Sequence, residues 1–446
     1  MSGWAAAKED APAQLEPSPA LDGPPEFLCP ITLDMMWDPV VGPTGITYDR
    51  AGIEAWLLPT GRGTCPVTHG ELCAEDLVPN HTLRRHIQAW CAANSFHGVE
   101  RVPTPRTPAT PAQAADAVAE VEAAAREGDA AWCAEAAHGV RHLARVGDRN
   151  RQCLASAGAA RALAVAFASF APSAGAAGTG DVLDDVLAAL VLVMPIDEEA
   201  IAAIGSSRAS VARLVTVAAH GDLHRRLQAV VLVREIVTFS CNGSGAGAID
   251  LSANVDAIVE VVVKTVRDAI CPQATKACLV AAWHLAQADE CAAARLAAAG
   301  LVPVLVELLV DADRSSAEMA LATLDATLAS SDGRARARAD ALAVPVLVKK
   351  MFRVSDTATE LVVSTLWRIC NLRQDDDGMD TAEARRLAIV EALHVGALQK
   401  LLLLLQVGCM EETKEKATEL LGLMVKYQAK GECIDTMDFK GLNKVS

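Results

Sequence analysis

The sequence predicts an all-α superhelical solenoid, preceded by a small module that combines helices with a hairpin. Hydrophobic residues make up 52% of the 446 residues, but aromatic residues only 4%. A chain rich in alanine, leucine and valine and poor in aromatic residues favours helices over sheets. The second observation is a proline-rich stretch at residues 102–115, and the third is a helical pattern that recurs beyond it. A chain of this length exceeds one small core, so several units or one extended array are expected.

The composition excludes several classes of partner and location. The formal net charge of −16 repels phosphate backbones, so we expect no nucleic-acid partner. No apolar run approaches the roughly 18 to 20 residues that cross a bilayer, so no membrane span is expected. Thirteen cysteines lie scattered, several of them on apolar helical faces, as Cys278 and Cys370 do. This pattern is typical of reduced thiols in a cytoplasmic protein, with the nucleus as a second expected location.

Shifts in composition divide the chain into five segments. Residues 1–25 lack periodicity and predict a disordered leader without the apolar core of a secretory signal. Residues 26–98 predict a compact front module, and residues 99–115 a semi-extended linker, because its prolines resist helix formation. Residues 116–430 predict the solenoid, and residues 431–446 a tail.

The front module predicts the order loop, hairpin, helix, loop, helix. Pro39–Val41 and Ile46–Tyr48 flank four turn-forming residues, which is typical of a hairpin. Asp49 then suits the N-cap of the first helix, and Asn80 suits the N-cap of the second. Ile53, Trp56 and Leu57 fall at helical spacing in the first helix, and Leu83, Ile87 and Trp90 form one stripe of the second. Of these, Leu57, Leu83, Ile87 and Trp90 are expected in the core.

A small-residue turn followed by an apolar helix recurs through the second part of the chain. The turns lie at Gly158, Gly205, Gly300, Ala343 and Gly396, with a degenerate copy over residues 254–263. The intervals of 47 residues from Gly158 to Gly205, 43 from Gly300 to Ala343 and 53 from Ala343 to Gly396 are close to the roughly 40–47 of armadillo and HEAT units.

A second long helix is expected before each next turn, at residues 186–193, 227–238, 275–286, 318–328, 359–370 and 414–426. Helix pairs of this kind cannot bury their apolar faces alone, so neighbouring pairs stack into a superhelix. The sequence therefore predicts an armadillo/HEAT-like solenoid. Arg334, Arg336 and Arg338 alternate with alanines between two predicted helices, and we expect them in a solvated loop.

Cysteines and histidines gather in the front module, which raises the question of zinc. Structural zinc sites need ligand pairs at C-x2-4-C spacing, so that one turn presents two donors to the ion. Here Cys29-Pro30-Ile31-Thr32 and Cys65-Pro66-Val67-Thr68 resemble the two zinc knuckles of a RING finger, but each ends in threonine instead of a second cysteine. We therefore expect no bound metal.

Six motifs, in order along residues 26–94, closely resemble those of a U-box, which shares the RING fold and replaces zinc with hydrogen bonds and packing. With the helical repeats behind them, the chain resembles a plant U-box E3 ubiquitin ligase with armadillo repeats, of the type without a separate N-terminal helical domain. The motifs are Phe27-Leu28-Cys29-Pro30-Ile31-Thr32-Leu33, Asp38-Pro39-Val40, Thr44-Gly45-Ile46-Thr47-Tyr48-Asp49-Arg50, Ile53-Glu54-Ala55-Trp56-Leu57, Cys65-Pro66-Val67-Thr68 and Pro79-Asn80-His81-Thr82-Leu83-Arg84.

The resemblance implies partners and a binding face. In that family an apolar ridge across both loops and the first helix receives a loop of the E2 ubiquitin-conjugating enzyme. The positions that match the ridge are Ile31, Leu33, Trp56 and Pro66, and loops that hold apolar groups are typical of binding surfaces. His69 stands where some members carry a cation that holds the charged E2 in its reactive state, and histidine is only partly charged near neutral pH.

The resemblance further implies that the E2 carries the reactive thioester, while this protein supplies proximity and orientation. No catalytic residue of its own and no cofactor are expected. The expected partners are the E2, ubiquitin and a protein substrate on the armadillo repeats, with a homodimer through the U-box as a further implication and stress or defence signalling as a context.

Three other interpretations stay open. A free Cys65 near His69 suggests a nucleophilic pair, but no set of oxyanion donors accompanies it. A metal-dependent enzyme would require ligand pairs that the sequence lacks. The strongest alternative is a non-catalytic armadillo scaffold whose U-box is degenerate, because the cation is missing at His69.

Overall fold

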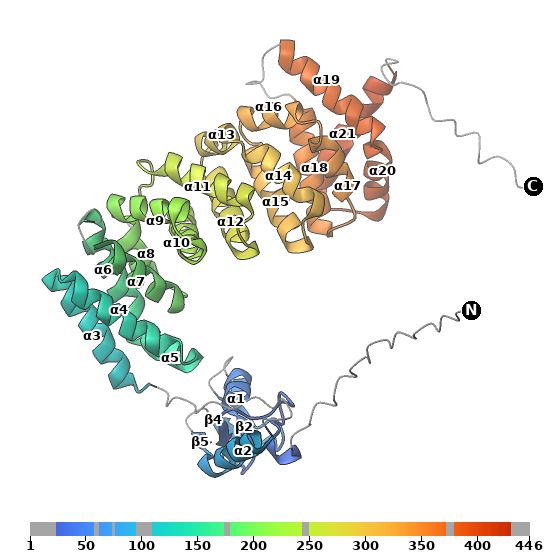
Figure 1. Ribbon diagram of the computed structural model, residues 1–446. Coiled ribbons are helices and arrows are strands. Elements are labelled where there is room, and N and C mark those ends of the chain that lie inside the picture. The colour runs from blue at the N-terminus through green and yellow to red at the C-terminus, as the bar shows by residue number, and fades with distance from the viewer. Residues whose placement is uncertain are drawn as a thin grey trace, which may run out of the picture. The chain divides into compact units, whose positions relative to one another are not determined.

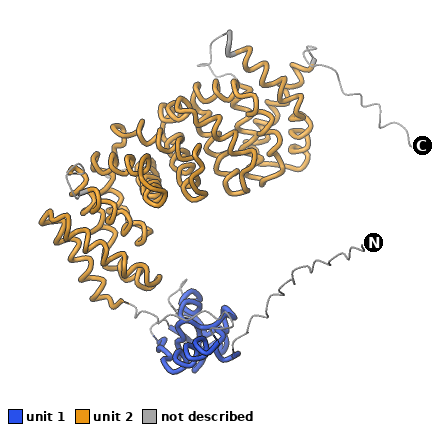
Figure 2. Tube along the Cα trace, viewed as in Figure 1, with its two compact units in different colours: residues 1–107 blue, residues 108–446 orange. Residues whose placement is uncertain are grey.

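The computed structural model describes residues 24–57, 62–73, 76–94, 109–173, 179–242, 249–371 and 379–429. The chain divides into two compact units, residues 1–107 and residues 108–446 (Figure 2). The predicted leader up to residue 23, most of the predicted linker and the predicted tail lie outside the described residues.

The described residues of the first unit form two small sheets, two α-helices and one 3-10 helix. Strands β2, β1 and β5 form one antiparallel sheet in that order, and β3 pairs with β4 in the other. The elements are the 3-10 helix η1 (Pro25–Phe27), β1 (Pro39–Val41), β2 (Thr47–Asp49), α1 (Arg50–Leu57), β3 (Arg62–Thr64), β4 (Glu71–Cys73), β5 (Val78–Pro79) and α2 (His81–Ala93).

The predicted hairpin is confirmed, with Val40 opposite Tyr48 in its register. Asn80 caps α2 as predicted, because its side chain accepts a hydrogen bond from the Leu83 N–H at 3.1 Å. The prediction that Asp49 caps the first helix is wrong. Its carboxylate accepts the backbone N–H groups of Trp37 at 2.7 Å and Asp38 at 2.9 Å, so it ties the loop before β1 to the end of β2.

The second unit is entirely helical in its described residues (Figure 1). Its elements are α3 (Pro111–Glu127), α4 (Ala130–Ala144), α5 (Asp148–Ser156), α6 (Ala159–Phe170), the 3-10 helix η4 (Ala171–Ser173), α7 (Thr179–Leu192), α8 (Glu198–Gly205), α9 (Arg208–His220), α10 (Leu223–Asn242), α11 (Val255–Asp268), α12 (Pro272–Ala288), α13 (Glu290–Ala298), α14 (Leu301–Asp311), α15 (Arg314–Thr327), α16 (Ser331–Ala339), α17 (Ala343–Lys350), α18 (Asp356–Cys370), α19 (Met379–His394), α20 (Ala397–Val407) and α21 (Glu411–Ala429).

Helix α3 starts inside the segment that the sequence places in the linker. Pro111 is its first residue, and Thr110 caps it through a reciprocal pair of hydrogen bonds with Gln113. Proline is compatible with the first turn of a helix, because the N–H that it lacks has no intrahelical partner there. The expectation that residues 111–115 are extended is therefore wrong.

The repeating unit is a helix triplet, where the sequence predicted a pair. The first helix, which has nine residues in α5 and α13, meets the second at a sharp bend, for example 69° between α5 and α6 and 75° between α13 and α14. The third helices then pack on one another, so that α12, α15 and α18 lie side by side (Figure 1). The degenerate repeat contributes only α11 and α12, and no helix precedes α11 within residues 249–254.

The repeat glycines serve two different purposes. Gly158, Gly300 and Gly396 have φ values of 82°, 90° and 83°, and each lies at the bend before a second helix. Glycine adopts this left-handed conformation without the steric cost that a Cβ brings. Gly205, predicted as an equivalent turn, is instead the last residue of α8, before the 89° bend into α9. An added Cβ there would come within 2.3 Å of Ile249.

The prediction of a solvated loop for Arg334, Arg336 and Arg338 is also wrong. These residues lie in α16, and Arg334 is 2% exposed, with Nη1 donating to the Ala329 carbonyl at 2.6 Å. Arg338 donates to the carbonyls of Ile369 and Asn371, at the end of α18. Guanidinium groups here satisfy carbonyls at helix ends, which otherwise lack intrahelical partners.

The apolar residues of the solenoid form one continuous core that runs from α3 to α21. The predicted core thiols Cys278 and Cys370 are buried in it, and burial raises the pKa of each to about 12. Among the described residues, no single helix is long and apolar enough to cross a membrane, although four bent pairs meet that test jointly by length and composition.

Candidate functional site

Two loops of the first unit have the same backbone geometry. In the first, the Leu33 N–H donates to the Cys29 carbonyl at 2.9 Å, and in the second the His69 N–H donates to the Cys65 carbonyl at 2.9 Å. Leu33 and His69 both adopt a left-handed backbone, with φ values of 61° and 58°. Residues other than glycine rarely adopt this conformation. Leu33 and His69 therefore occupy equivalent positions, each four residues after the cysteine of a Cys-Pro pair.

The two thiols hold these loops from inside. The Cys29 Sγ accepts the Asp49 N–H at 3.3 Å. The Cys65 Sγ lies 2.9 Å from the Tyr48 hydroxyl, and it also accepts the Thr68 N–H at 3.3 Å. Both cysteines are 0% exposed. Each sulfur is thus a buried acceptor at the root of its loop.

An ion-pair cluster fixes the strand and both helices to one another. The Asp38 carboxylate accepts Arg50 Nε at 2.7 Å and also pairs with Arg84. Arg50 starts α1 and Arg84 lies in the first turn of α2, so one carboxylate joins both helices to the strand entry. The three side chains are only 12–16% exposed. The sequence interpretation did not single out these residues, although all three lie inside the motifs quoted for the resemblance.

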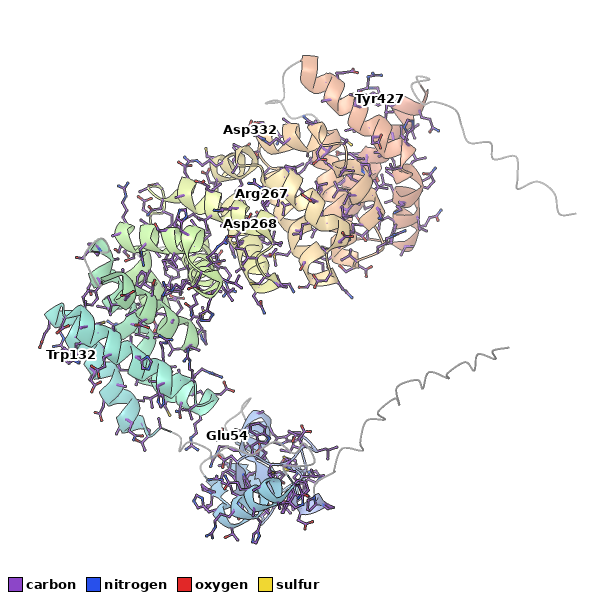
Figure 3. The ribbon with its side chains drawn as sticks, viewed as in Figure 1. Glu54, Trp132, Arg267, Asp268, Asp332 and Tyr427 are labelled. Atoms are coloured by element: carbon purple, nitrogen blue, oxygen red, sulfur yellow. The ribbon has the colours of Figure 1, made fainter. Side chains whose placement is uncertain are left out.

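Helix α1, which Glu54 marks in Figure 3, contacts both loops. At its start, a Cβ on Gly52 would lie 3.2 Å from Thr32 Cγ2, so the helix packs directly on the first loop. At its end, the Trp56 indole N–H donates to the Thr64 carbonyl at 3.0 Å, one residue before the second loop. The helix therefore links the two loops and presents the Trp56 ring beside the second one.

No group of three or more His, Cys, Asp or Glu side chains in the described residues is arranged to hold a metal ion. The donors that a zinc ion would need are used otherwise, since both thiols accept hydrogen bonds and Thr32 and Thr68 follow them in the loops. The absence of a bound metal stays a prediction.

Comparison with known proteins matches both units. The U-box domain family matches residues 24–96, and the family described as the plant U-box protein ARM repeat region matches residues 114–444. The chain belongs to the plant U-box proteins with armadillo repeats.

Individual relatives are similar over nearly their whole length. U-box domain-containing protein 21 of Arabidopsis thaliana is 34% identical over 441 residues, which cover 96% of this chain and 94% of the relative. E3 ubiquitin-protein ligase PUB23 of Arabidopsis thaliana is 32% identical, with 92% and 95% covered. U-box domain-containing protein 75 of Oryza sativa subsp. japonica is 31% identical, with 90% and 81% covered. The predicted family and the predicted fold, a U-box before an armadillo solenoid, are confirmed.

The structure places the predicted E2-binding residues of the U-box in two classes. Leu33 is 74% exposed, Trp56 is 52% exposed and His69 is exposed. Ile31 and Pro66 are half-buried, and Ile31 packs against the U-box core. Their role in docking stays a prediction, but the exposed residues are better placed for it. The remaining core predictions for the two helices are confirmed, with Leu57 and Ile87 buried and Leu83 and Trp90 half-buried against the same cluster.

Sequence reasoning missed one residue of this surface. Val67, between Pro66 and Thr68, is 49% exposed and lies at the loop position that Ile31 occupies in the first loop. Its position, an apolar residue directly after a Cys-Pro pair in an irregular loop, is the sequence feature that could have identified it. We refer to Leu33, Trp56, Val67 and His69 as the exposed loop face.

The stability of the U-box is expected to depend on pH through the thiol of Cys65. Burial alone would raise its pKa, but hydrogen bonds from Thr44, Thr68 and Tyr48 outweigh burial and lower the pKa to about 6 from an ordinary 9.0. A pKa that is lower in the folded state stabilises the fold fully above the unfolded pKa. This stabilisation therefore shrinks as the pH falls from 9.0 and is lost below about 6.

Replacing Tyr48 with phenylalanine removes one of these donors, so we expect the Cys65 pKa to rise toward 9.0. The ultraviolet thiolate absorbance, taken as the difference from a Cys65→Ser variant, measures this titration. Tyr427→Phe in α21 is the matched control, because it alters the other tyrosine of the chain. An unchanged Cys65 titration in Tyr48→Phe would contradict the assignment of this hydrogen bond.

Proposed function

We propose how this U-box E3 ubiquitin ligase works: the U-box holds a ubiquitin-charged E2 without a thioester of its own, while the armadillo solenoid binds the protein to be modified. The observation that carries the proposal is the exposed loop face, where Leu33, Trp56 and Val67 are 74%, 52% and 49% exposed. Exposed apolar side chains that gather on loops are typical of interaction sites.

The state of the cysteines supports a non-covalent role. Cys29 and Cys65 are 0% exposed and their sulfurs already accept hydrogen bonds, so neither reaches a thioester on a partner protein. The reactive bond then stays on the E2, whose thioester a substrate lysine attacks. The ligase accelerates this step by holding the reactants in a productive orientation.

A reaction with E1, E2, ubiquitin and ATP tests the proposal. The full chain is expected to promote ubiquitin chains on itself, and discharge of a pre-charged E2 onto free lysine is expected to accelerate. On a non-reducing gel the ligase carries no ubiquitin that a thiol reductant removes. A reductant-sensitive adduct on this chain would contradict the non-covalent mechanism, and no activity across a broad panel of E2 enzymes would contradict the docking role.

Replacing His69 with arginine is expected to speed ubiquitin transfer about tenfold, because a permanent cation can add one charge-assisted hydrogen bond to the E2–ubiquitin pair. His69 is exposed, so the folded U-box is expected to keep its melting temperature. His86→Arg, at an exposed position in α2, is the matched control. The single-turnover discharge rate measures the effect, and equal rates for both variants and the wild type would show that His69 does not contact the pair.

The scaffold alternative is not favoured, because relatives that match more than nine-tenths of both chains carry the name E3 ubiquitin-protein ligase. Homodimerisation through the U-box, a cytoplasmic or nuclear location and a role in stress or defence signalling remain proposals.

A further inference from the structure

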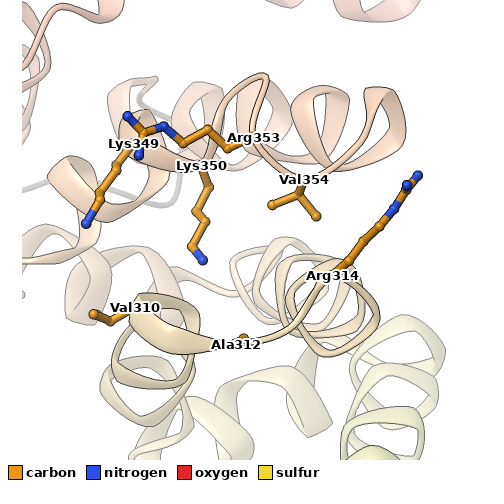
Figure 4. A pocket seen from close by; sticks show the side chains of 7 residues that line it. All are labelled: Val310, Ala312, Arg314, Lys349, Lys350, Arg353 and Val354. Atoms are coloured by element: carbon orange, nitrogen blue, oxygen red, sulfur yellow. The ribbon is translucent and has the colours of Figure 1, made fainter.

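A basic pocket opens between two neighbouring armadillo repeats, at the ends of α14 and α17 (Figure 4). Its volume is about 230 Å³. Four of the lining residues are cations, namely Arg314, Lys349, Lys350 and Arg353, and no carboxylate is among the residues that line it. Such a concentration of positive charge is notable in a chain with a net charge of −16.

Of the four cations that line this basic pocket, only Arg314 has an acidic partner among the described residues. Arg314 Nε lies 3.4 Å from Glu318, on the same helix. Lys349, Lys350 and Arg353 form no ion pair with any carboxylate in the described part of the chain. The nearby Asp313 instead caps α15 through the Ser316 N–H at 3.0 Å. Three of the cations that line the pocket therefore have no acidic partner among the described residues.

A fifth cation adds to this field from the next repeat. Lys400 of α20 donates through Nζ to the Val348 carbonyl of α17 at 2.5 Å. Burial, and after it the charge of Arg353, lowers the pKa of Lys400. Mutual repulsion among cations costs free energy, and a bound anion would relieve it.

The turn that carries two of the lining residues is fixed before any ligand binds. Phe352 has a φ of 64°, rare for a bulky residue, and its N–H donates to Thr359 Oγ1 at 3.0 Å. Met351 beside it is 1% exposed, and the Arg353 N–H donates to the Lys350 carbonyl at 3.1 Å. Ordering costs on binding are therefore small for the backbone of this turn.

The residues that line the pocket indicate which kind of ligand it binds. A phosphorylated side chain carries close to two negative charges near neutral pH and offers three acceptor oxygens, which match several Lys and Arg donors. Val310, Ala312 and Val354 line the same pocket and provide apolar contacts for the residues that flank the phosphate. Figure 4 shows Lys350 and Val354 reaching toward the gap from one side, opposite Ala312.

A peptide fits these observations better than a membrane surface does. Screening limits the field of a charge to roughly 8 Å at physiological ionic strength, so a single phosphate interacts with the pocket cations alone. An anionic bilayer faces a much wider area of this acidic chain and is repelled by it. We infer that the basic pocket binds a phosphoserine or phosphothreonine of a protein substrate, so that the solenoid selects phosphorylated proteins. This inference rests on the proposed role of the solenoid in substrate binding.

Fluorescence polarisation with the full-length protein tests the inference. The probes are two labelled degenerate peptide libraries, one with a fixed central phosphothreonine or phosphoserine and one with the same positions unphosphorylated. We expect the phosphorylated library to bind at least about tenfold more tightly, the equivalent of one charge-assisted contact. The double variant Lys349→Glu/Arg353→Glu is expected to lose this preference, and Lys349→Gln/Arg353→Gln to weaken it without reversing charge. Both side chains are exposed, so unchanged thermal unfolding verifies the fold.

Arg336→Glu/Lys426→Glu is the matched control, because it makes the same change in net charge at two exposed positions away from the pocket. It is expected to keep the preference for phosphate. Equal binding of both libraries, a preference that survives the double variant at the pocket, or binding to phosphatidylserine vesicles in place of the phosphorylated library would each overturn the inference. The assay contains no E1, E2 or ubiquitin, so its failure is separate from a failure of the ligase reaction, which the E2 discharge assay detects.

Discussion

Replacing Leu33 with glutamate is expected to reduce E2-dependent ubiquitin transfer by about 30- to 1000-fold, the loss of a central apolar anchor worth roughly 2–4 kcal/mol. Leu33 is 74% exposed at the tip of the first loop, and its left-handed backbone directs it out of the U-box core. A carboxylate there would be desolvated when the E2 docks. Trp56→Ala in α1 is expected to have a similar effect, because its ring lies beside the second loop.

These variants separate loss of docking from loss of folding better than changes at Ile31 or Pro66 do. Ile31 and Pro66 are half-buried, so replacing either with an acid would disturb the fold as well as docking. Val78→Glu on β5 is the matched control, because Val78 is 59% exposed but lies outside the predicted docking residues. Thermal unfolding and the E2 discharge rate are measured for all three proteins. Full activity in both Leu33→Glu and Trp56→Ala would show that the E2 binds elsewhere.

Replacing Asp38 with alanine is expected to unfold the U-box and leave the solenoid intact. The substitution removes the carboxylate shared by Arg50 and Arg84, whose side chains are each 12% exposed, and leaves Arg50 with Glu54 at 3.4 Å as its acidic partner. Breaking a buried ion pair by removing one partner costs about 3–5 kcal/mol, a large share of the stability of a small domain. Hydrogen exchange measured by mass spectrometry separates the two units, so faster exchange is expected in β1, β2 and α2 but not in α12 or α15.

Glu71→Ala on β4 is the control for loss of a carboxylate, because this side chain is exposed and forms no ion pair in the described residues. A triple variant with Asp38→Ala, Arg50→Met and Arg84→Met is expected to regain part of the lost stability, since it removes the two guanidinium groups that Asp38→Ala deprives of their shared carboxylate. Slow exchange in β1 and α2 of Asp38→Ala would contradict the structural role of the cluster. We predict that the U-box binds no zinc, so added chelator is expected to have no effect on the wild type.

The turn and cap chemistry of the repeats could be predicted from the sequence only in part. The bends at Gly158, Gly300 and Gly396 could be predicted, because a glycine before an apolar run is typical of a left-handed turn. The first helix of each triplet was not predicted from the sequence. Helices α5, α13 and α16 have nine residues each, too few for a clear apolar period and too few to be stable alone. They form because the neighbouring repeat packs on them, which no local pattern records.

The sequence by itself determined that the front module is a U-box, that an armadillo solenoid follows it and that two loops and a helix form the candidate docking face. The caps, apolar stripes and repeats follow from local spacing, because each lies within a few residues. The U-box and its docking face follow from the resemblance that the ordered motifs carry to a known family. Only the tertiary structure decided which of those residues are exposed for docking. It also showed that Asp38 joins Arg50 to Arg84, and that cations from α15, α17 and the turn after α17 line one pocket. Each of these depends on which side chains meet across segments distant in sequence, and exposure and charge pairing follow from packing alone.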